Sequence, residues 1–199
     1  ESGWTNEAIV LVDTTPPAVP AMKVMPLFTN ATVLTFEWSA AIDAVRYEFS
    51  YSKDSGATWN QVPNLTAQSY AVNIEDVSDG VAVLGKVRAY DGVGNVSVYS
   101  GEVQTTIDRT GPVVTITDPT EAVITNAATF AYEWTAVDAG GGVGGFKIKF
   151  NGAEHATTDS PWAGTLVPGD NTFEVVAIDK LGNEGAPVAA PVVKQVLAL

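Results

Sequence analysis

Six carboxylates occupy positions from which they could bind a cation together. They are Glu75, Asp76 and Asp79 in "EDVSDG", Asp108 in "IDRTGP", Asp138 before "AGGGVGG", and Asp179 in "VAIDKLGN". Carboxylates gathered at one place repel one another unless they are solvated, spread apart or bridged by a cation. Calcium takes about six to eight oxygen ligands in flexible geometry, so these residue types predict a calcium site. The alternative is that Asp and Gly simply favour turns.

The segment "SKDSGATW" at 52–59 resembles the Asp-box motif of sialidase propellers and other extracellular β domains. Asp54 and Gly56 fall in the turn of an expected hairpin, where Asp accepts backbone hydrogen bonds and Gly permits positive φ. We therefore interpret the motif as a folding device in which Trp59 covers the turn. The alternative is that Trp59 and Trp162 contact a sugar ligand.

The remaining candidates for catalysis are weak, and we expect no enzyme. His155 is the only histidine and lies just past an expected hairpin turn, away from any recognisable nucleophile motif. The glycine run at 139–145 is not a phosphate loop, because no Lys-Ser/Thr pair closes it and no helix follows. The chain has no cysteine, which excludes disulfides, zinc-thiolate sites and thiol nucleophiles.

The net charge and the hydropathy of the chain argue against two classes of partner, nucleic acids and membranes. A net charge of -13 repels phosphates and anionic lipids, so we expect no nucleic-acid partner. The apolar runs are short, such as "AIVLV" at 8–12, and we expect no membrane insertion.

An internal repeat organises the 199 residues into two copies of one module. "FEWSA" at 36–40 recurs as "YEWTA" at 132–136, and "VDTTPP" at 12–17 recurs as "IDRTGP" at 107–112. "RAYDGVGN" at 88–95 recurs as "VAIDKLGN" at 176–183, with a shorter middle in the second copy. We therefore expect sandwiches at 15–108 and 109–199, preceded by a strand and linker at 1–14.

Each copy alternates apolar and polar residues with period 2, which is typical of half-buried strands. Leu34, Phe36 and Trp38 share one face, and Phe130 and Tyr132 repeat the pattern. The "NG" pair at 151–152 predicts a tight hairpin. Seven strands, the number of a β-sandwich, are expected in the first copy. Their ranges are 20–27, 31–38, 44–52, 58–62, 67–74, 82–90 and 96–107.

The topology of such a sandwich decides which carboxylates can meet. The start of the module, the loop after its second strand and its last hairpin share one pole. We therefore expect Asp108, Asp138 and Asp179 together at the junction between the modules. The loop before the sixth strand of the first module lies at the opposite pole, which adds Glu75, Asp76 and Asp79.

The early-strand Trp, the "A-x-D-x-x-G-N" hairpin and the "D-x-T-x-P" linker resemble tandem fibronectin type III and bacterial immunoglobulin-like repeats. The resemblance covers nearly the whole chain and implies an all-β fold of two tandem Greek-key β-sandwiches. It also implies a cell-surface or secreted protein. Val83 departs from the pattern, since many fibronectin type III modules carry Tyr at this place. Such modules serve as spacers, adhesins, filament subunits and sugar binders alike.

Prolines in the linkers indicate a mechanical role. Pro16, Pro17 and Pro112 restrict the backbone and remove donors, so consecutive modules should form a semi-rigid rod. We therefore expect a non-catalytic structural or adhesive segment of an extracellular surface protein. Its partners would be other copies of itself, neighbouring domains or glycans. The alternative is an accessory carbohydrate-binding module of a secreted glycosidase.

The first residues align without gaps to 96–112, and thus predict the final strand of a preceding module. This strand needs a partner to pair with. Either the chain was cut from a longer array and the strand packs on a neighbour by accident, or the strand is added to a sheet of another subunit, as in self-assembling filaments. Trp4, Ile9 and Leu11 are the side chains expected to serve assembly. The absence of "D-x-T-x-P" near Leu199 favours a natural end there.

Overall fold

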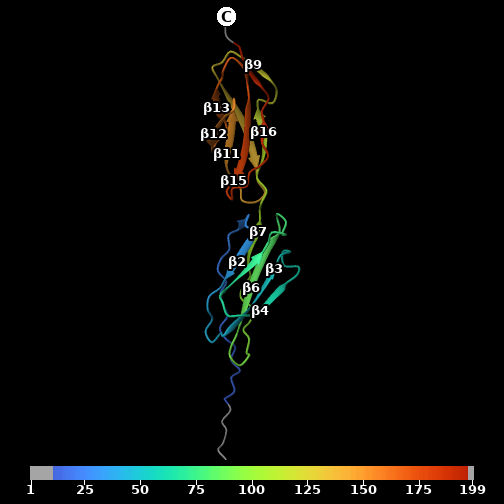
Figure 1. Ribbon diagram of the computed structural model, residues 1–199, viewed down its shortest axis with the longest axis vertical. Helices are drawn as coiled ribbons and strands as arrows, with labels where there is room; N and C mark the ends of the chain where they lie inside the picture. The colour runs from blue at the N-terminus through green and yellow to red at the C-terminus, as the bar shows by residue number, and fades with distance from the viewer. Residues whose placement is uncertain (1–10, 197–199) are drawn as a thin grey trace, which may run out of the picture. The chain divides into compact units, whose positions relative to one another are not determined.

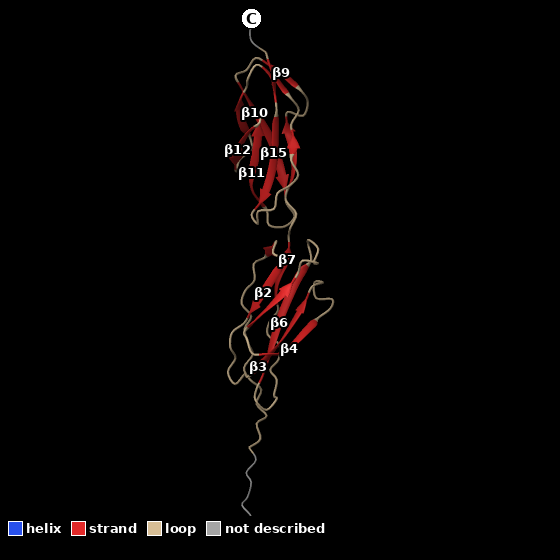
Figure 2. Ribbon diagram, in the orientation of Figure 1, coloured by secondary structure: helices blue, strands red, loops and turns tan. Residues whose placement is uncertain are grey.

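The computed structural model describes residues 11–196, and every regular element among them is a β-strand (Figure 2). The predicted all-β fold is therefore confirmed. No helix in this part of the chain is long and apolar enough to cross a membrane.

The chain divides into two compact units. The first part of the chain down to Met25 belongs to unit 1, together with Thr32–Asp76 and Ala82–Gln104. Unit 2 takes the short segments Pro26–Ala31 and Val77–Val81 and everything from Thr105 onward. These units are defined by spatial contacts, whereas the expected boundaries 1–14, 15–108 and 109–199 were taken from the repeat in the sequence. The segments Pro26–Ala31 and Val77–Val81 therefore belong to unit 2 by contacts but to 15–108 by the repeat.

Unit 1 is built on two sheets. One contains β6, β3 and β4 in this order, and the other pairs β2 with β5. The bounds are β2 (Val33–Glu37), β3 (Arg46–Ser52), β4 (Asn60–Leu65), β5 (Ser69–Asn73) and β6 (Ala82–Tyr90). β7 (Val103–Ile107) begins in unit 1 and ends in unit 2. The buried face carries Phe36, Trp38 and Phe49, with the Phe49 ring 5.1 Å from Phe36 and 5.5 Å from Trp38.

The expected strand at 20–27 does not form. Met22 makes a single bridge with Trp38, and the next element, β1 (Phe28–Thr29), pairs in parallel with Thr106 and Ile107 within unit 2. Pro20 and Pro26 flank the segment and lack the N–H donors that a continuous ladder needs.

Unit 2 contains the remaining strands in three sheets, seen from yellow-green to red in Figure 1. The sheet orders are β13-β10-β8, β12-β11-β15-β16 and β14-β17-β9. The bounds are β8 (Val113–Asp118), β9 (Val123–Thr125), β10 (Thr129–Val137), β11 (Val143–Phe150), β12 (Ala153–Thr157), β13 (Trp162–Thr165), β14 (Gly169–Asn171), β15 (Phe173–Asp179), β16 (Val188–Ala189) and β17 (Val193–Gln195). The short β16 and β17 are separated by Pro191, which interrupts the run.

The predicted hairpin at Asn151-Gly152 is confirmed. It joins β11 to β12, and both residues have positive φ, 48° and 84°. Two consecutive left-handed residues match the twist of the flanking strands, which is why this dipeptide is favoured there.

The core of unit 2 is aromatic. The rings of Tyr132 and Phe173 stack with centroids 4.2 Å apart and an interplanar angle of 4°. Trp134 and Trp162 lie 5.6 and 6.0 Å from Phe173. Phe173 thus joins β10, β13 and β15 in one packed cluster.

One polar side chain is wholly buried beside this core. Asn171 Oδ1 accepts hydrogen bonds from Val167 N and Asn151 Nδ2, while its Nδ2 contacts the carbonyls of Val167, Gly169 and Val193. Its exposed fraction is 0%. The side chain therefore ties the turn before β14 to the neighbouring strand β17 and to the β11–β12 hairpin.

Candidate functional site

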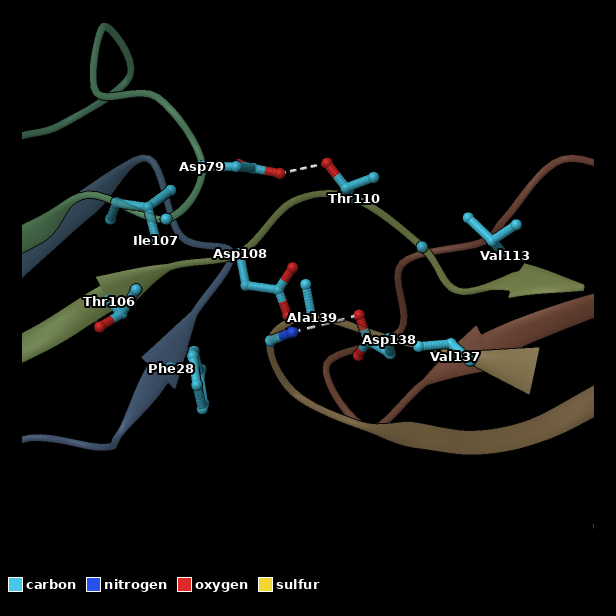
Figure 3. A pocket seen from close by; sticks show the side chains of 13 residues that line it. Phe28, Asp79, Thr106, Ile107, Asp108, Thr110, Val113, Val137, Asp138 and Ala139 are labelled. Carbon is cyan, nitrogen blue, oxygen red and sulfur yellow. Dashed lines mark hydrogen bonds between the residues drawn. The ribbon is translucent and has the colours of Figure 1, made fainter.

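Three of the predicted carboxylates meet in unit 2. Asp108 follows β7, Asp138 follows β10, and Asp179 ends β15. Each offers one carboxylate oxygen, and these oxygens all lie within 4.8 Å of one another. Asp108 and Asp138 are drawn in Figure 3, where the Asp108 side chain points toward the loop that follows Asp138. We call these three residues the aspartate cluster.

The "D-x-x-x-N" loop after β15 orients Asp179. Its Oδ1 accepts hydrogen bonds from the backbone N–H groups of Leu181 and Asn183, both at 2.8 Å. Its Oδ2 accepts one from Asn183 Nδ2 at 2.7 Å. The same amide also donates to the Asp108 carbonyl at 3.0 Å, so one Asn side chain links two members of the cluster.

The glycine-rich loop holds the other two members. Gly141 N donates to Asp108 Oδ2 at 2.6 Å, and Gly142 N donates to Asp138 Oδ2 at 2.5 Å. A Cβ at Gly140 would lie 2.3 Å from Asp108 Cγ, so no other residue type fits there without displacing the carboxylate. The glycines of this loop therefore allow close approach to Asp108.

This geometry suits a hard cation. Two oxygens that each lie about 2.4 Å from one calcium ion are at most about 4.8 Å apart, which the cluster satisfies. Asp108 and Asp179 are 5% and 4% exposed, so water screens their mutual repulsion poorly. Backbone carbonyls and waters would have to supply the remaining ligands.

Unit 1 carries the same loop without such a cluster. Asp91 Oδ1 accepts from Val93, Gly94 and Asn95, and Asn95 Nδ2 reaches Asp91 Oδ2 and the Asp13 carbonyl. Burial raises the pKa of Asp91, but these hydrogen bonds outweigh it and lower the pKa. Asp43, in the loop between β2 and β3, is exposed, and no group of three or more possible metal ligands forms within the described part of unit 1.

The other three predicted ligands, Asp79, Glu75 and Asp76, do not join the aspartate cluster. Asp79 accepts from the Thr110 hydroxyl and from Arg109 N, as Figure 3 shows for Thr110. Glu75 and Asp76 belong to unit 1, where Asp76 pairs with Lys53 at 2.5 Å. Neither is grouped with the aspartate cluster.

A cavity of about 480 Å³ adjoins the cluster within unit 2. Asp108 and Asp138 form part of its wall (Figure 3). Most of the remaining wall is apolar and comes from Phe28, Ile107, Val113, Val137 and Ala139. The carboxylates thus lie beside apolar surface, which strengthens their electrostatic interactions.

The Asp-box segment forms a closed turn. Asp54 Oδ1 accepts from Ser52 Oγ at 2.6 Å and from Thr58 N at 2.8 Å, and Asp54 Oδ2 accepts from Thr58 Oγ1. Ser52 Oγ in turn accepts from Gly56 N at 2.8 Å. The hydrogen bond from Ser52, followed by those from Thr58, lowers the pKa of Asp54 to about 2. Both carboxylate oxygens of Asp54 thus accept hydrogen bonds from within the loop.

Replacing Asp54 by alanine should lower the melting temperature of unit 1 at neutral pH. Its folded pKa of about 2 lies below the ordinary value of 3.8, so its contribution is present above that value and is lost as pH falls through about 2. The difference between wild type and Asp54→Ala should therefore shrink between about pH 4 and pH 2 in thermal melts. Asp54→Asn, which keeps an acceptor but cannot ionise, is the matched variant. A difference that stays constant with pH would contradict this role.

The two predicted sugar-contact tryptophans lie in different units. Trp59 is partly exposed, and Lys86 Nζ lies 3.6 Å from the centroid of its ring. Trp162 packs into the aromatic core of unit 2, with Phe150 at 5.4 Å. His155 is exposed and its ring lies 5.1 Å from Trp162, so it belongs to the rim of that core. Sugar contact at either tryptophan stays a prediction.

The predicted assembly residues are mostly outside the described part of the chain. Trp4 and Ile9 lie outside it, and Leu11 is 92% exposed and belongs to no strand. Strand addition therefore stays a prediction from the sequence.

Sequence reasoning did not single out Asn183. It also missed a row of cations and aromatic rings on unit 1, formed by Trp59, Lys86, Tyr99, Arg88, Tyr90 and Arg46. The repeated "G-N" ending of both hairpins was a usable signal for Asn183, because the same Asn–Asp contact occurs in both copies. The row cannot be recognised as a motif in the sequence, because its members come from β3, β6 and two loops.

No family model matches this chain. One curated protein, exoglucanase B of Cellulomonas fimi, is 30% identical over 188 residues. That alignment covers 89% of this chain and 16% of the exoglucanase, so the chain spans about a sixth of that protein's length.

Solved structures similar to the chain include fibronectin(III)-like modules of CbhA from Clostridium thermocellum. They are 14% identical, with a TM-score of 0.43 and coverage of 90% of this chain and 95% of that one. A Ca2+-stabilized, ice-binding adhesin of an Antarctic bacterium is 16% identical, with a TM-score of 0.49 and coverage of 94% and 50%. Fibronectin type III-like modules and a bacterial adhesin, the kinds of protein that the sequence resembles, are thus among the solved structures similar to this chain.

Proposed function

We propose that this chain is a non-catalytic structural segment of an extracellular protein and that calcium stabilises its second unit. The tandem repeat supports the structural role, because compact units of this kind can fold on their own and serve as spacers between other domains. Similarity to part of an exoglucanase favours a second candidate, an accessory segment of a secreted carbohydrate-active enzyme. Both candidates need a stable spacer.

The aspartate cluster is the observation that carries the calcium proposal. Three side chains from separate loops approach within 4.8 Å, and a loop of glycines admits the central carboxylate. Bound calcium would offset two of the three negative charges and would join the start of the module, the loop after β10 and the loop after β15. The related loops of unit 1 lack this grouping, so calcium should act on unit 2 alone.

Adding millimolar calcium to chelated protein should raise the apparent stability of unit 2. A ligand that binds only the folded state, present at about 100 times its Kd, adds about 2.7 kcal/mol. Calorimetry with and without calcium measures this, and Asp138→Asn should remove most of the effect. Asp43→Asn in unit 1 is the matched control and should leave the effect intact. An unchanged melting curve, or an equal response of both variants, would rule out the site.

A further inference from the structure

Six side chains of unit 1 alternate between aromatic and cationic along one sheet face. Tyr47 and Phe49 of β3 are buried in the core, so Arg46 and Glu48 point to the opposite face. Their neighbours across the sheet on β6 are Tyr90 and Arg88. We call the complete row the ladder, and its order is Trp59, Lys86, Tyr99, Arg88, Tyr90 and Arg46.

Each cation of the ladder lies against a ring. Lys86 Nζ is 3.6 Å from the Trp59 centroid and 5.4 Å from that of Tyr99. Arg88 Cζ is 4.8 Å from Tyr99 and 5.6 Å from Tyr90. All four distances fall within the range of about 6 Å at which a cation is attracted to a ring face. The rings thus hold the charged groups in an extended row.

A buried carboxylate fixes the middle of the ladder. Glu48 is 7% exposed and accepts hydrogen bonds from Arg88 Nε at 3.1 Å, Tyr90 Oη at 3.0 Å and Tyr99 Oη at 2.5 Å. Burial raises the pKa of Glu48, but the hydrogen bonds, led by that of Tyr99, lower it overall. Glu48 therefore stays ionised and orients the ladder from below.

Arg46 and Lys86 are the cations of the ladder that do not contact the buried Glu48. Arg46 makes no ion pair among the described residues, and its guanidinium lies 4.8 Å from the Tyr90 centroid. A guanidinium stacked on a ring keeps N–H donors at its edge for carboxylates. Lys86 pairs only with Glu102, whose side chain is 46% exposed. Arg88 also pairs with Glu48 at 2.9 Å, so the three cations of the ladder face two carboxylates and leave a net positive charge on a protein whose net charge is -13.

The fold does not require this row. On the corresponding face of unit 2, Lys149 stands opposite Glu154 and Glu174, and Lys147 pairs with Glu184. Ala156 and Val176 are the neighbours of Lys147 across the sheet, so aromatic rings are missing at the equivalent places. Two copies of one module differ here, which indicates a role beyond folding.

We propose that the ladder binds a linear polysaccharide that carries carboxylates. Lys86 and Arg88 are two residues apart on one strand, hence about 7 Å, and Arg46 lies across the sheet from Tyr90. Regularly spaced cations fit the repeated charges of an extended polyanion. The partly exposed rings between them offer apolar surface to sugar C–H groups.

A polysaccharide fits this surface better than an acidic peptide. One way in which peptides gain affinity is by adding a strand to an open sheet edge, where backbone groups are free. β3 and β6 are internal strands of their sheet, so their backbone groups are already paired. Only side chains are available on this face, and their rings and cations together suit a carboxylated sugar.

Affinity electrophoresis of the full chain in gels containing polygalacturonate tests this proposal. We expect retardation that weakens as salt rises, because exposed charge pairs are screened. The double variant Arg46→Gln/Lys86→Gln should bind about tenfold more weakly, since two exposed pairs are lost. Lys147→Gln/Lys149→Gln on unit 2 is the matched control and should bind like wild type. Thermal melts verify that both double variants are folded.

Two further gels complete the design. A neutral cellulose derivative should not retard the protein, and neither should polyglutamate. Absence of retardation by polygalacturonate overturns the proposal, as does equal weakening in both double variants. Equal retardation by polyglutamate would overturn the assignment to a polysaccharide, because charge alone would then explain binding.

Discussion

Replacing Phe173 by alanine should destabilise unit 2 by about 3–5 kcal/mol, the range measured when a large buried ring is removed from a core. The ring stacks on Tyr132 at 4.2 Å and contacts two tryptophans, so its removal leaves a cavity that rigid neighbours cannot fill. Hydrogen exchange of peptides from each unit, followed over a denaturant series, measures the loss unit by unit.

Phe49→Ala is the matched substitution in unit 1, because Phe49 stacks on Trp38 with an interplanar angle of 12°. Each variant should lower protection in its own unit. A loss below about 1 kcal/mol for Phe173→Ala would show that the core closes over the gap and would contradict the packing described here.

The second large effect is expected at Asn171. Leucine has the same branched shape and number of heavy atoms but cannot hydrogen-bond, so Asn171→Leu would leave Val167 N and three carbonyls without their partner. Each buried group left unsatisfied costs about 1–3 kcal/mol, and we expect a total loss of about 3 kcal/mol or more in chemical denaturation of unit 2. The loss should appear without any change in the aromatic core.

Asn126 offers the control for this prediction. It is exposed in the same unit, and Asn126→Leu should change the free energy of unfolding by no more than about 0.5 kcal/mol. If Asn171→Leu were equally mild, the hydrogen bonds of Asn171 would contribute little, and apolar burial would compensate for them.

Local patterns were sufficient for much of the fold. The alternation around Phe36 and Tyr132 identified the buried faces, and the dipeptide at Asn151 identified a hairpin, because both depend on a few neighbouring residues. The prediction of a strand at 20–27 was wrong because pairing there depends on more than the local pattern. Its apolar residues favoured a strand, but prolines on both sides removed the donors, and only tertiary pairing shows that Met22 keeps a single bridge.

The candidate sites were harder to predict from sequence. The general topology brought Asp108, Asp138 and Asp179 to one pole, but it could not show that Asp79 turns to Thr110 instead. Side-chain direction depends on local hydrogen bonds that no spacing encodes. The ladder could not be predicted from the sequence either, because Trp59 and Tyr99 come from loops whose course depends on the whole sheet.

The contact of Gly140 with Asp108 also bears on how tandem arrays of such modules diversify. Because a single added Cβ would collide with the carboxylate, the cluster depends on a loop that any duplicated copy can lose by one substitution. Copies would then keep the same scaffold while differing in this cluster, and the loop at 40–45 of unit 1, which contains no glycine, illustrates such a difference. With calcium bound as proposed, an array could combine segments that respond to calcium with segments that do not, through changes in one short loop.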